Sequence, residues 1–406
     1  MSEQLLDARA AATEPGEYWA GMTEAVADIP APVAAVNLGA LRQNALDLVL
    51  RARGVPIRVA SKSVRVRQVL DAVQQIPGYR GILAFTLAEA LWLARDHDDI
   101  VLGYPTVDQA ALRALLGDED ACQKITLMVD DPAHLDLIDQ IEPASSRPTL
   151  RVALDVDASW RRPGFGHVGV RRSPLHHTAE VVPVARQISE RAGFRLVGLM
   201  MYEAQIAGQP DAVGAGDIPI HWMKRRSGEE LIERRASVTR RLREITDLEF
   251  VNGGGTGSLE LTASDQSVTE VTAGSGLFAG HLFDGYRTFT PAPAAAFALD
   301  VVRKPAADIV TVHGGGWIAS GPPSASRQPQ PVWPPGLRTL AREGAGEVQT
   351  PLRGPAAREL AVGDRVWFRH AKSGEFAERV NEVQLVDSDR VVTAAASYRG
   401  EGMTFL

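Results

Sequence analysis

Lys62 is a lysine at the end of a short apolar stretch early in the chain, residues 57–62. A lysine amine can form an imine with the aldehyde of a bound cofactor. Two glycine-rich turns follow far downstream, at 252–257 and 273–276. Glycine turns that open onto helices offer backbone N–H groups to a phosphate. An amine anchor and a phosphate cup are what pyridoxal phosphate (PLP) needs, so this combination predicts a PLP site.

Short apolar stretches alternate with stretches of helical period along the chain, and both kinds must position these residues. The predicted strands are 57–62, 81–85, 100–103, 125–129, 151–155, 196–201, 248–252 and 270–273. The predicted helices are 38–51, 66–75, 87–95, 108–116, 132–140, 180–191 and 229–244. Eight alternating strands are the count of a closed (β/α)₈ barrel, although the pattern alone leaves an open doubly wound sheet as an alternative. The candidate residues follow several different strands, which favours the barrel, and two long links at 156–178 and 202–226 belong to the same rim.

The chain changes character after Pro291. Strands are predicted at 297–302, 309–312, 365–370, 382–386 and 390–395, with proline-rich loops at 321–336 and 351–355. We therefore predict an α/β fold, with a PLP-binding (β/α)₈ barrel at 31–290 and a mostly β C-terminal domain at 291–406. The N-terminal segment 1–30 is expected to pack on the second domain. The apolar run 33–36 could also join the β domain, which would make that domain discontinuous.

The composition excludes several classes of protein. The 406 residues are 45% hydrophobic, which is enough for one large domain and a smaller one. A net charge of -7 argues against a nucleic-acid partner, because phosphate backbones require a basic surface. The sequence has no long apolar run and no basic, apolar start, so we expect a cytoplasmic protein without a membrane partner. The single cysteine, Cys122, excludes an intrachain disulfide.

Other side chains could complete the site. Tyr202 closes the sixth predicted strand and could pack beside a cofactor ring. His167, in the long link after the fifth strand, could contact the cofactor or move a proton. Thr256 and Ser258 add hydroxyl donors to the first glycine turn. Four arginines in the same link as His167 could clamp a substrate carboxylate: Arg161, Arg162, Arg171 and Arg172.

Two histidines of the second domain are candidate general bases. His370 ends the predicted strand 365–370, and His313 opens a run of three glycines. Either could face the mouth of the barrel as a base. Alternatively, His370 and Glu375 could bind a divalent ion.

Together these residues resemble those of the fold-type III PLP enzymes, the alanine racemases and, more closely, the D-threonine aldolase and D-serine dehydratase group. The resemblance covers nearly the whole chain, and its most specific parts are the Gly-Gly-Gly-Thr-Gly turn and the Glu-Val-Thr-Ala-Gly-Ser turn. It implies that Lys62 forms the internal aldimine and that the second domain is D-serine dehydratase-like. It further implies a homodimer, a small amino acid as substrate, and a cofactor site formed by His167, Tyr202, Gly254, Gly255, Thr256, Thr272, Gly274 and Ser275.

Three positions depart from that family pattern. Relatives carry His-x-Cys or His-x-Asp as a metal pair, whereas this chain reads His370-Ala371-Lys372. Lys372 thus stands at the usual second-ligand position, and a protonated ammonium cannot ligate a cation, which argues against a divalent metal. Thr272 stands where the racemases place an arginine at the pyridine nitrogen, and His167 stands where relatives tend to have arginine.

The resemblance implies a PLP-dependent lyase acting on a D- or β-hydroxy amino acid, by retro-aldol cleavage or by dehydration and deamination. His370 or His313 would then be the base. An amino-acid racemase is the alternative, but it needs two bases on opposite faces of Cα, and Tyr398 is the one tyrosine after Pro291. A PLP carrier without turnover is a second alternative, which the large second domain disfavours.

Overall fold

The computed structural model describes residues 5–162, 164, 166–212, 214 and 217–406. The chain forms two compact units, each assembled from separate segments. The barrel unit comprises Leu48–Lys62, Pro77–Gly274 and Phe405–Leu406. The sheet unit comprises Met1–Asp47, Ser63–Ile76 and Ser275–Thr404. The predicted domain limits of 31–290 and 291–406 follow the order of the chain, whereas both units draw on segments that are distant in sequence.

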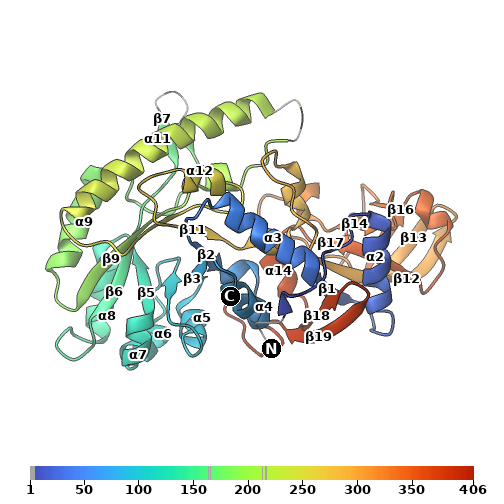
Figure 1. The fold of residues 1–406 in the computed structure, drawn as a ribbon, viewed down its shortest axis with the longest axis horizontal. Coiled ribbons are helices and arrows are strands. Elements are labelled where there is room, and N and C mark those ends of the chain that lie inside the picture. The colour runs from blue at the N-terminus through green and yellow to red at the C-terminus, as the bar shows by residue number, and fades with distance from the viewer. Residues whose placement is uncertain (1–4, 163, 165, 213, 215–216) are drawn as a thin grey trace. The chain divides into compact units, whose positions relative to one another are not determined.

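The barrel unit contains a closed barrel of eight parallel strands, which confirms the predicted fold (Figure 1). Each strand overlaps its predicted range, but the first ends at Ala60, so that Lys62 lies just beyond it. In barrel order the strands are β10 (Phe250–Gly253), β11 (Glu270–Ala273), β2 (Ile57–Ala60), β3 (Tyr79–Ala84), β4 (Ile100–Leu102), β5 (Ile125–Val129), β6 (Leu150–Asp155) and β9 (Phe194–Met201).

Helices follow the strands of this unit, and Figure 1 shows α5 to α9 along the outer side of the barrel. They are α5 (Leu87–Leu93), α6 (Gln109–Leu116), α7 (Glu119–Lys124), α8 (Pro132–Ile141), α9 (Thr178–Glu190), α10 (Ala204–Ala207), α11 (Asp217–Arg243) and α12 (Leu259–Ala263). The long α11 begins inside the link expected at 202–226. Pro219 is tolerated there because it lies in the first helical turn, and strong helix formers follow it.

The barrel interior is filled by apolar side chains from neighbouring strands. A cluster of Val101, Met128, Ala153, Val197, Met200 and Phe250 occupies it. Gly198 makes room for the largest of them, because a Cβ at this glycine would lie 2.2 Å from the Phe250 ring. The barrel is therefore a packed core, and any chemistry belongs to its rim.

The sheet unit is built on a nine-stranded sheet with the order β15-β16-β13-β12-β1-β18-β19, in which β17 pairs with β12 and β14. The early strand β1 (Val33–Asn37) pairs with β12 and β18, so the β domain is discontinuous in sequence. The other strands are β12 (Ala295–Ala306), β13 (Ile309–His313), β14 (Gln330–Trp333), β15 (Arg338–Thr339), β16 (Gln349–Arg353), β17 (Arg365–Arg369), β18 (Glu382–Asp387) and β19 (Arg390–Ala396). A separate two-stranded sheet, β7 (Trp160–Arg162) with β8 (Gly166–Val168), lies in the barrel unit's link at 156–178.

The N-terminal helix α2 (Pro15–Ala25) packs on this sheet through aromatic side chains. The Trp19 and Trp367 rings lie 5.7 Å apart, and the Trp367 indole N–H donates to the Thr23 hydroxyl at 2.9 Å. The remaining helices include α3 (Leu38–Arg51), which runs from the sheet unit into the barrel unit, α4 (Arg67–Gln74), α13 (Ser275–Phe278) and α14 (Ser373–Ala377). Within the described residues, none of the helices has the length and apolar character needed to cross a membrane.

Candidate active site

Lys62 lies in a single 3-10 turn, Ser61–Ser63, directly after β2. The Ser61 hydroxyl donates to the Leu83 carbonyl at 3.1 Å, which ties this turn to β3. The Lys62 Nζ donates a hydrogen bond of 2.7 Å to the hydroxyl of Tyr104, which follows β4. Three neighbouring strands thus hold the amine at the rim formed by their C-terminal ends.

Tyr104 was not among the residues selected from the sequence. Its only sequence signal is its place, since a phenol two residues after a barrel strand reaches the functional rim. A second cation lies near the same ring, with the Arg172 guanidinium carbon 6.0 Å from the ring centroid. Arg172, one of the four arginines predicted as a clamp, therefore lies near Tyr104, the hydrogen-bond partner of the Lys62 amine.

Arg172 also influences two groups at the ends of neighbouring strands. Burial raises the pKa of Tyr202 to about 12, and Arg172 opposes that rise. Burial likewise raises the pKa of Asp155, the last residue of β6, to about 7; the Asp130 carboxylate adds to this rise and Arg172 opposes it. The rim thus combines the Lys62 amine, the Arg172 guanidinium and the phenols of Tyr104 and Tyr202. It also has the Asp155 carboxyl, whose pKa is about 7.

His167 lies in β8, within the link after β6. Its Nε2 is 2.9 Å from the Val170 carbonyl, a local contact within the link. Arg161 of the facing strand β7 donates to the Asp157 carboxylate at 2.5 Å. The cofactor contact proposed for His167 and the substrate clamp proposed for Arg161 stay predictions.

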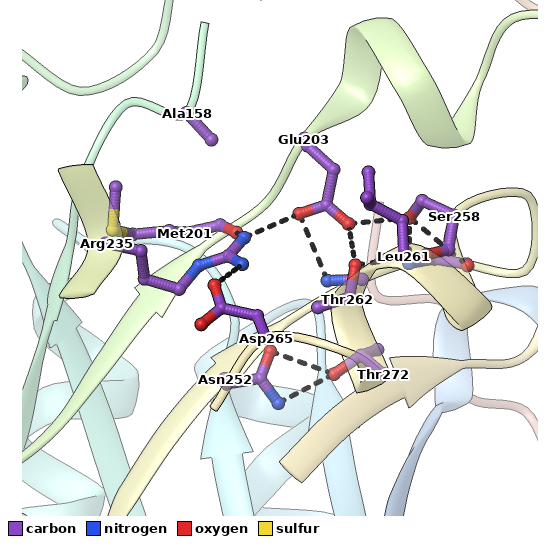
Figure 2. A network of polar contacts seen from close by, with 12 residues as sticks. Ala158, Met201, Glu203, Arg235, Asn252, Ser258, Leu261, Thr262, Asp265 and Thr272 are labelled. Atoms are coloured by element: carbon purple, nitrogen blue, oxygen red, sulfur yellow. Dashed lines mark hydrogen bonds and ion pairs between the residues drawn. The ribbon is translucent and has the colours of Figure 1, made fainter. Parts of the chain in front are cut away.

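The first glycine turn follows β10 and is tied to Glu203, whose carboxylate also contacts Ser258 and Thr262 (Figure 2). The Gly254 N–H donates to the Glu203 carboxylate at 3.3 Å, and the Gly255 N–H donates to the Ser258 hydroxyl at 3.1 Å. These two N–H groups, which the sequence suggested for a phosphate, are thus engaged in building the turn. Gly254 has a φ of +88°, which favours glycine, and the Thr256 carbonyl accepts from Arg51 at 2.5 Å.

The second glycine turn follows β11 and approaches the strand that carries Lys62. A Cβ at Gly274 would lie 2.6 Å from the Ala60 carbonyl oxygen, so this position requires glycine. Ser275 begins helix α13 and is already part of the sheet unit, where its carbonyl accepts from the Ser373 hydroxyl at 3.2 Å.

Thr272, in β11, is held by a chain of buried polar groups. Its hydroxyl contacts the Asn252 side chain in both directions, at 2.9 and 3.1 Å. The Asn252 amide also donates to Glu270 at 2.8 Å, and Glu270 pairs with Arg58. The Glu270 carboxylate therefore neutralises the Arg58 guanidinium. At the position where the racemases place an arginine, this chain has the uncharged hydroxyl of Thr272.

His370, in the sheet unit, is 2% exposed. Its Nε2 lies 3.0 Å from the Ser373 hydroxyl, and its ring stacks on Phe376 with centroids 4.8 Å apart. Burial lowers the pKa of His370 to about 3, with a further contribution from Arg369. These surroundings are typical of a buried structural histidine, whereas His313 at the end of β13 is exposed. The role of either histidine as a base stays a prediction.

Lys372, which stands at the expected second metal-ligand position, has anionic and hydroxyl neighbours instead. Its Nζ donates to the Ser320 hydroxyl at 2.8 Å and lies 3.7 Å from the Glu375 carboxylate. Ser320 in turn donates to Glu375 through its hydroxyl at 2.5 Å. Across the part of the chain that the structure describes, no three His, Cys, Asp or Glu side chains are grouped in a way that could hold a metal.

The barrel residues fit the predicted cofactor. An amine with a hydroxyl partner, a Tyr202 ring and two close-packed glycine turns occur at one rim. A Cβ at Gly255 would lie 3.1 Å from the Tyr202 ring, so the turn and the ring form adjoining walls. A phosphate needs such close backbone approach, and an aldehyde needs an accessible amine.

Residues 36–281, more than half of the chain, match the alanine racemase N-terminal domain family. The chain belongs to this family. It is therefore a fold-type III PLP enzyme by family, as the sequence predicted, and PLP is the cofactor of that family. D-threonine aldolase from Arthrobacter sp. is 28% identical over 291 residues, which are 68% of this chain and 69% of that protein.

Solved structures of alanine racemase-like proteins share the fold. Crystalline D-threonine aldolase from Filomicrobium marinum has a TM-score of 0.76 and 17% identity, covering 94% of this chain and 97% of its own. D-threo-3-hydroxyaspartate dehydratase from Delftia sp. HT23 has a TM-score of 0.74 and 19% identity, covering 92% and 98%. Alanine racemase from E. faecalis gives a lower TM-score of 0.59, with 17% identity and coverage of 86% and 92%.

Proposed function

We propose that the protein is a PLP-dependent lyase that acts on a D-configured β-hydroxy amino acid. The hydrogen bond between Lys62 and Tyr104 at the barrel rim carries this proposal, because it offers an amine for the cofactor beside a proton-carrying hydroxyl. The relationship to D-threonine aldolase supports the choice of reaction, and the fold shared with a hydroxyaspartate dehydratase supports the substrate class.

Lys62 would hold the cofactor's aldehyde, and the turns after β10 and β11 would enclose its phosphate, with Tyr202 along one wall. When bound, PLP supplies an electron sink that stabilises negative charge at the substrate Cα. Thr272 offers a neutral hydroxyl at the position matched to the pyridine nitrogen. Thr272 is uncharged, so its pull on these electrons is weaker than that of the arginine that the racemases place at this position.

Proton transfer is assigned to the pair at the rim. Lys62 Nζ carries the proton that the substrate Cα loses or regains. Tyr104 Oη orients Lys62 Nζ for this transfer through their 2.7 Å hydrogen bond. Arg172, close to the Tyr104 ring, is the cation best placed to attract the substrate carboxylate. The exposed His313 is retained as the candidate base for the β-hydroxyl, and a homodimer as the candidate assembly.

A two-step experiment tests this proposal. The protein is first loaded with PLP and reduced with borohydride, and peptide mass analysis is expected to find the adduct on Lys62. Lys62→Arg is expected to lose the adduct and all turnover. Lys304→Arg, a matched change at a lysine that donates to the Arg358 and Leu360 carbonyls of the sheet unit, is expected to keep both.

The second step supplies D- and L-forms of threonine, serine and 3-hydroxyaspartate. Release of an aldehyde and glycine would establish retro-aldol cleavage, whereas release of ammonia and a keto acid would establish dehydration and deamination. Inversion of configuration alone would replace the lyase with a racemase. A spectral change without product would indicate a PLP carrier. Light scattering on the loaded protein tests the homodimer.

A further inference from the structure

Glu203 lies at the centre of a buried polar network in the barrel unit (Figure 2). It directly follows Tyr202 and has no exposed surface. Its carboxylate accepts from Ser258 at 2.6 Å, from Gly254 N–H at 3.3 Å and from the Thr262 hydroxyl. One carboxylate thus joins the end of β9 to the glycine turn after β10 and to helix α12.

Arg235 of α11 provides the countercharge. Its guanidinium is 1% exposed, donates to Glu203 at 3.0 Å and to Asp265 at 2.8 Å, and reaches the Met201 carbonyl at 3.0 Å. Two carboxylates around one guanidinium leave this network with a net negative charge. An excess of negative charge beside a phosphate site weakens anion binding, so simple attraction does not explain Glu203.

We infer that Glu203 is a positioning residue for the phosphate of the cofactor, an inference that rests on PLP being the ligand of this rim. Glu203 fixes Gly254 directly and Gly255 through the Ser258 hydroxyl, which donates to the carboxylate and accepts from the Gly255 N–H. Tyr202, its chain neighbour, forms the adjoining wall. The carboxylate therefore sets the spacing between the turn and the ring, while Arg235 holds the carboxylate in place.

Fold stability alone is the competing explanation for such a network. A positioning role and a purely stabilising role of Glu203 predict different effects on ligands with and without a phosphate. A residue that positions the phosphate turn affects PLP more than pyridoxal, the same aldehyde without phosphate. A residue that only stabilises the barrel affects both ligands equally.

The test compares dissociation constants for PLP and pyridoxal, measured from the absorbance change of imine formation with the full-length protein. Glu203→Gln keeps the size of the side chain but removes its charge. We expect this variant to bind PLP on the order of tenfold more weakly and pyridoxal within about threefold of the wild type, as the loss of one charged hydrogen-bond acceptor implies. Glu249→Gln, a matched loss at an ion pair with Arg151 and Arg195, is expected to change neither constant.

Equal weakening of PLP and pyridoxal by Glu203→Gln, or no weakening, would overturn the inference while leaving the proposed function intact. A wild-type protein that shows no preference for PLP over pyridoxal would overturn both. If Glu203→Gln does not fold, Ser258→Ala provides the same comparison. It removes the hydroxyl that connects Glu203 to Gly255 and leaves the Glu203–Arg235 ion pair, and the same selective loss of PLP affinity is expected.

Discussion

Two carboxyl groups at the ends of neighbouring barrel strands have opposite surroundings. Glu203 follows β9, has no exposed surface and accepts hydrogen bonds from Arg235, Ser258, Thr262 and Gly254. Asp155 ends β6 and is only partly buried. Within the described residues, no donor contacts its carboxylate, and the Ser173 hydroxyl donates to the Asp155 backbone carbonyl instead.

These different surroundings suit the two carboxyl groups to different roles at the same rim. The Glu203 carboxylate, with four donors around it, is fixed in position, which suits a residue that shapes a turn. Partial burial and the Asp130 carboxylate raise the pKa of Asp155 to about 7, so this carboxyl can exchange a proton near neutral pH, as groups at functional sites often do. The contacts around Glu203 thus hold the first glycine turn in place, whereas the side of the rim near Arg172 contains a carboxyl that can exchange a proton near neutral pH.

The largest expected effect comes from removing the countercharge on the rigid side. Arg235→Met leaves Glu203 and Asp265 buried without a cation, so we expect the free energy of unfolding to fall by roughly 3–5 kcal/mol. Arg226→Met, on the same helix, removes an exposed pair with Glu229 and is expected to cost no more than about 0.5 kcal/mol. Urea unfolding measures both variants. If Arg235→Met and Arg226→Met lowered the free energy of unfolding by similar amounts, Arg235 would not be the countercharge that the network depends on.

The strand pattern predicted the barrel because its strands are short runs rich in apolar residues, as expected for parallel strands that are covered on both faces. Lys62 and the two glycine turns were found for the same reason, since each directly follows such a run. Tyr104 follows one too, but a single tyrosine has no motif that separates it from core aromatic residues.

The Glu203 network could not be predicted, because its members are distant in sequence. Glu203 and Arg235 are separated by 32 positions, and Arg235 lies in a helix that carries many other charges. The strands β14 and β16 were missed for a different reason. Pro331 and Pro351 lie inside them and indicated loops. Pro331 is accommodated because β14, among the described strands, pairs only with β17 and has a register shift, and Pro351 because the pairing of β15 with β16 covers only Leu352 and Arg353.

A substitution of Tyr104 tests the side of the rim that contains Lys62 and Arg172. Tyr104→Phe keeps the ring beside Arg172 but removes the hydroxyl that accepts from Lys62. Because general acid–base groups contribute about 10²–10⁴-fold to rates, we expect kcat/KM to fall by at least about 100-fold. The same hydrogen bond contributes only about 1 kcal/mol to stability. Steady-state kinetics of the PLP-loaded protein across pH would measure the loss, and a change confined to KM would argue that Tyr104 only binds substrate.

The smallest expected effect concerns Asp155 and depends on pH. Its pKa is about 7 in the folded protein, above the ordinary value of 3.8, so the folded state binds its proton more tightly than the unfolded chain does. The contribution of this carboxyl to stability is therefore lost as pH rises from about 4 through about 7.

Asp155→Asn removes the ionisation, so at about pH 8 we expect the variant to be about 1–2 kcal/mol more stable than the wild type. The advantage is expected to disappear near pH 4, where the wild-type carboxyl is largely protonated in the folded state. Urea unfolding at a series of pH values measures this difference. If the gain in stability were the same at every pH, packing rather than ionisation would be its cause. That result would contradict an exchangeable proton on Asp155. A stabilised variant that also turns over substrate more slowly would place that proton in the reaction.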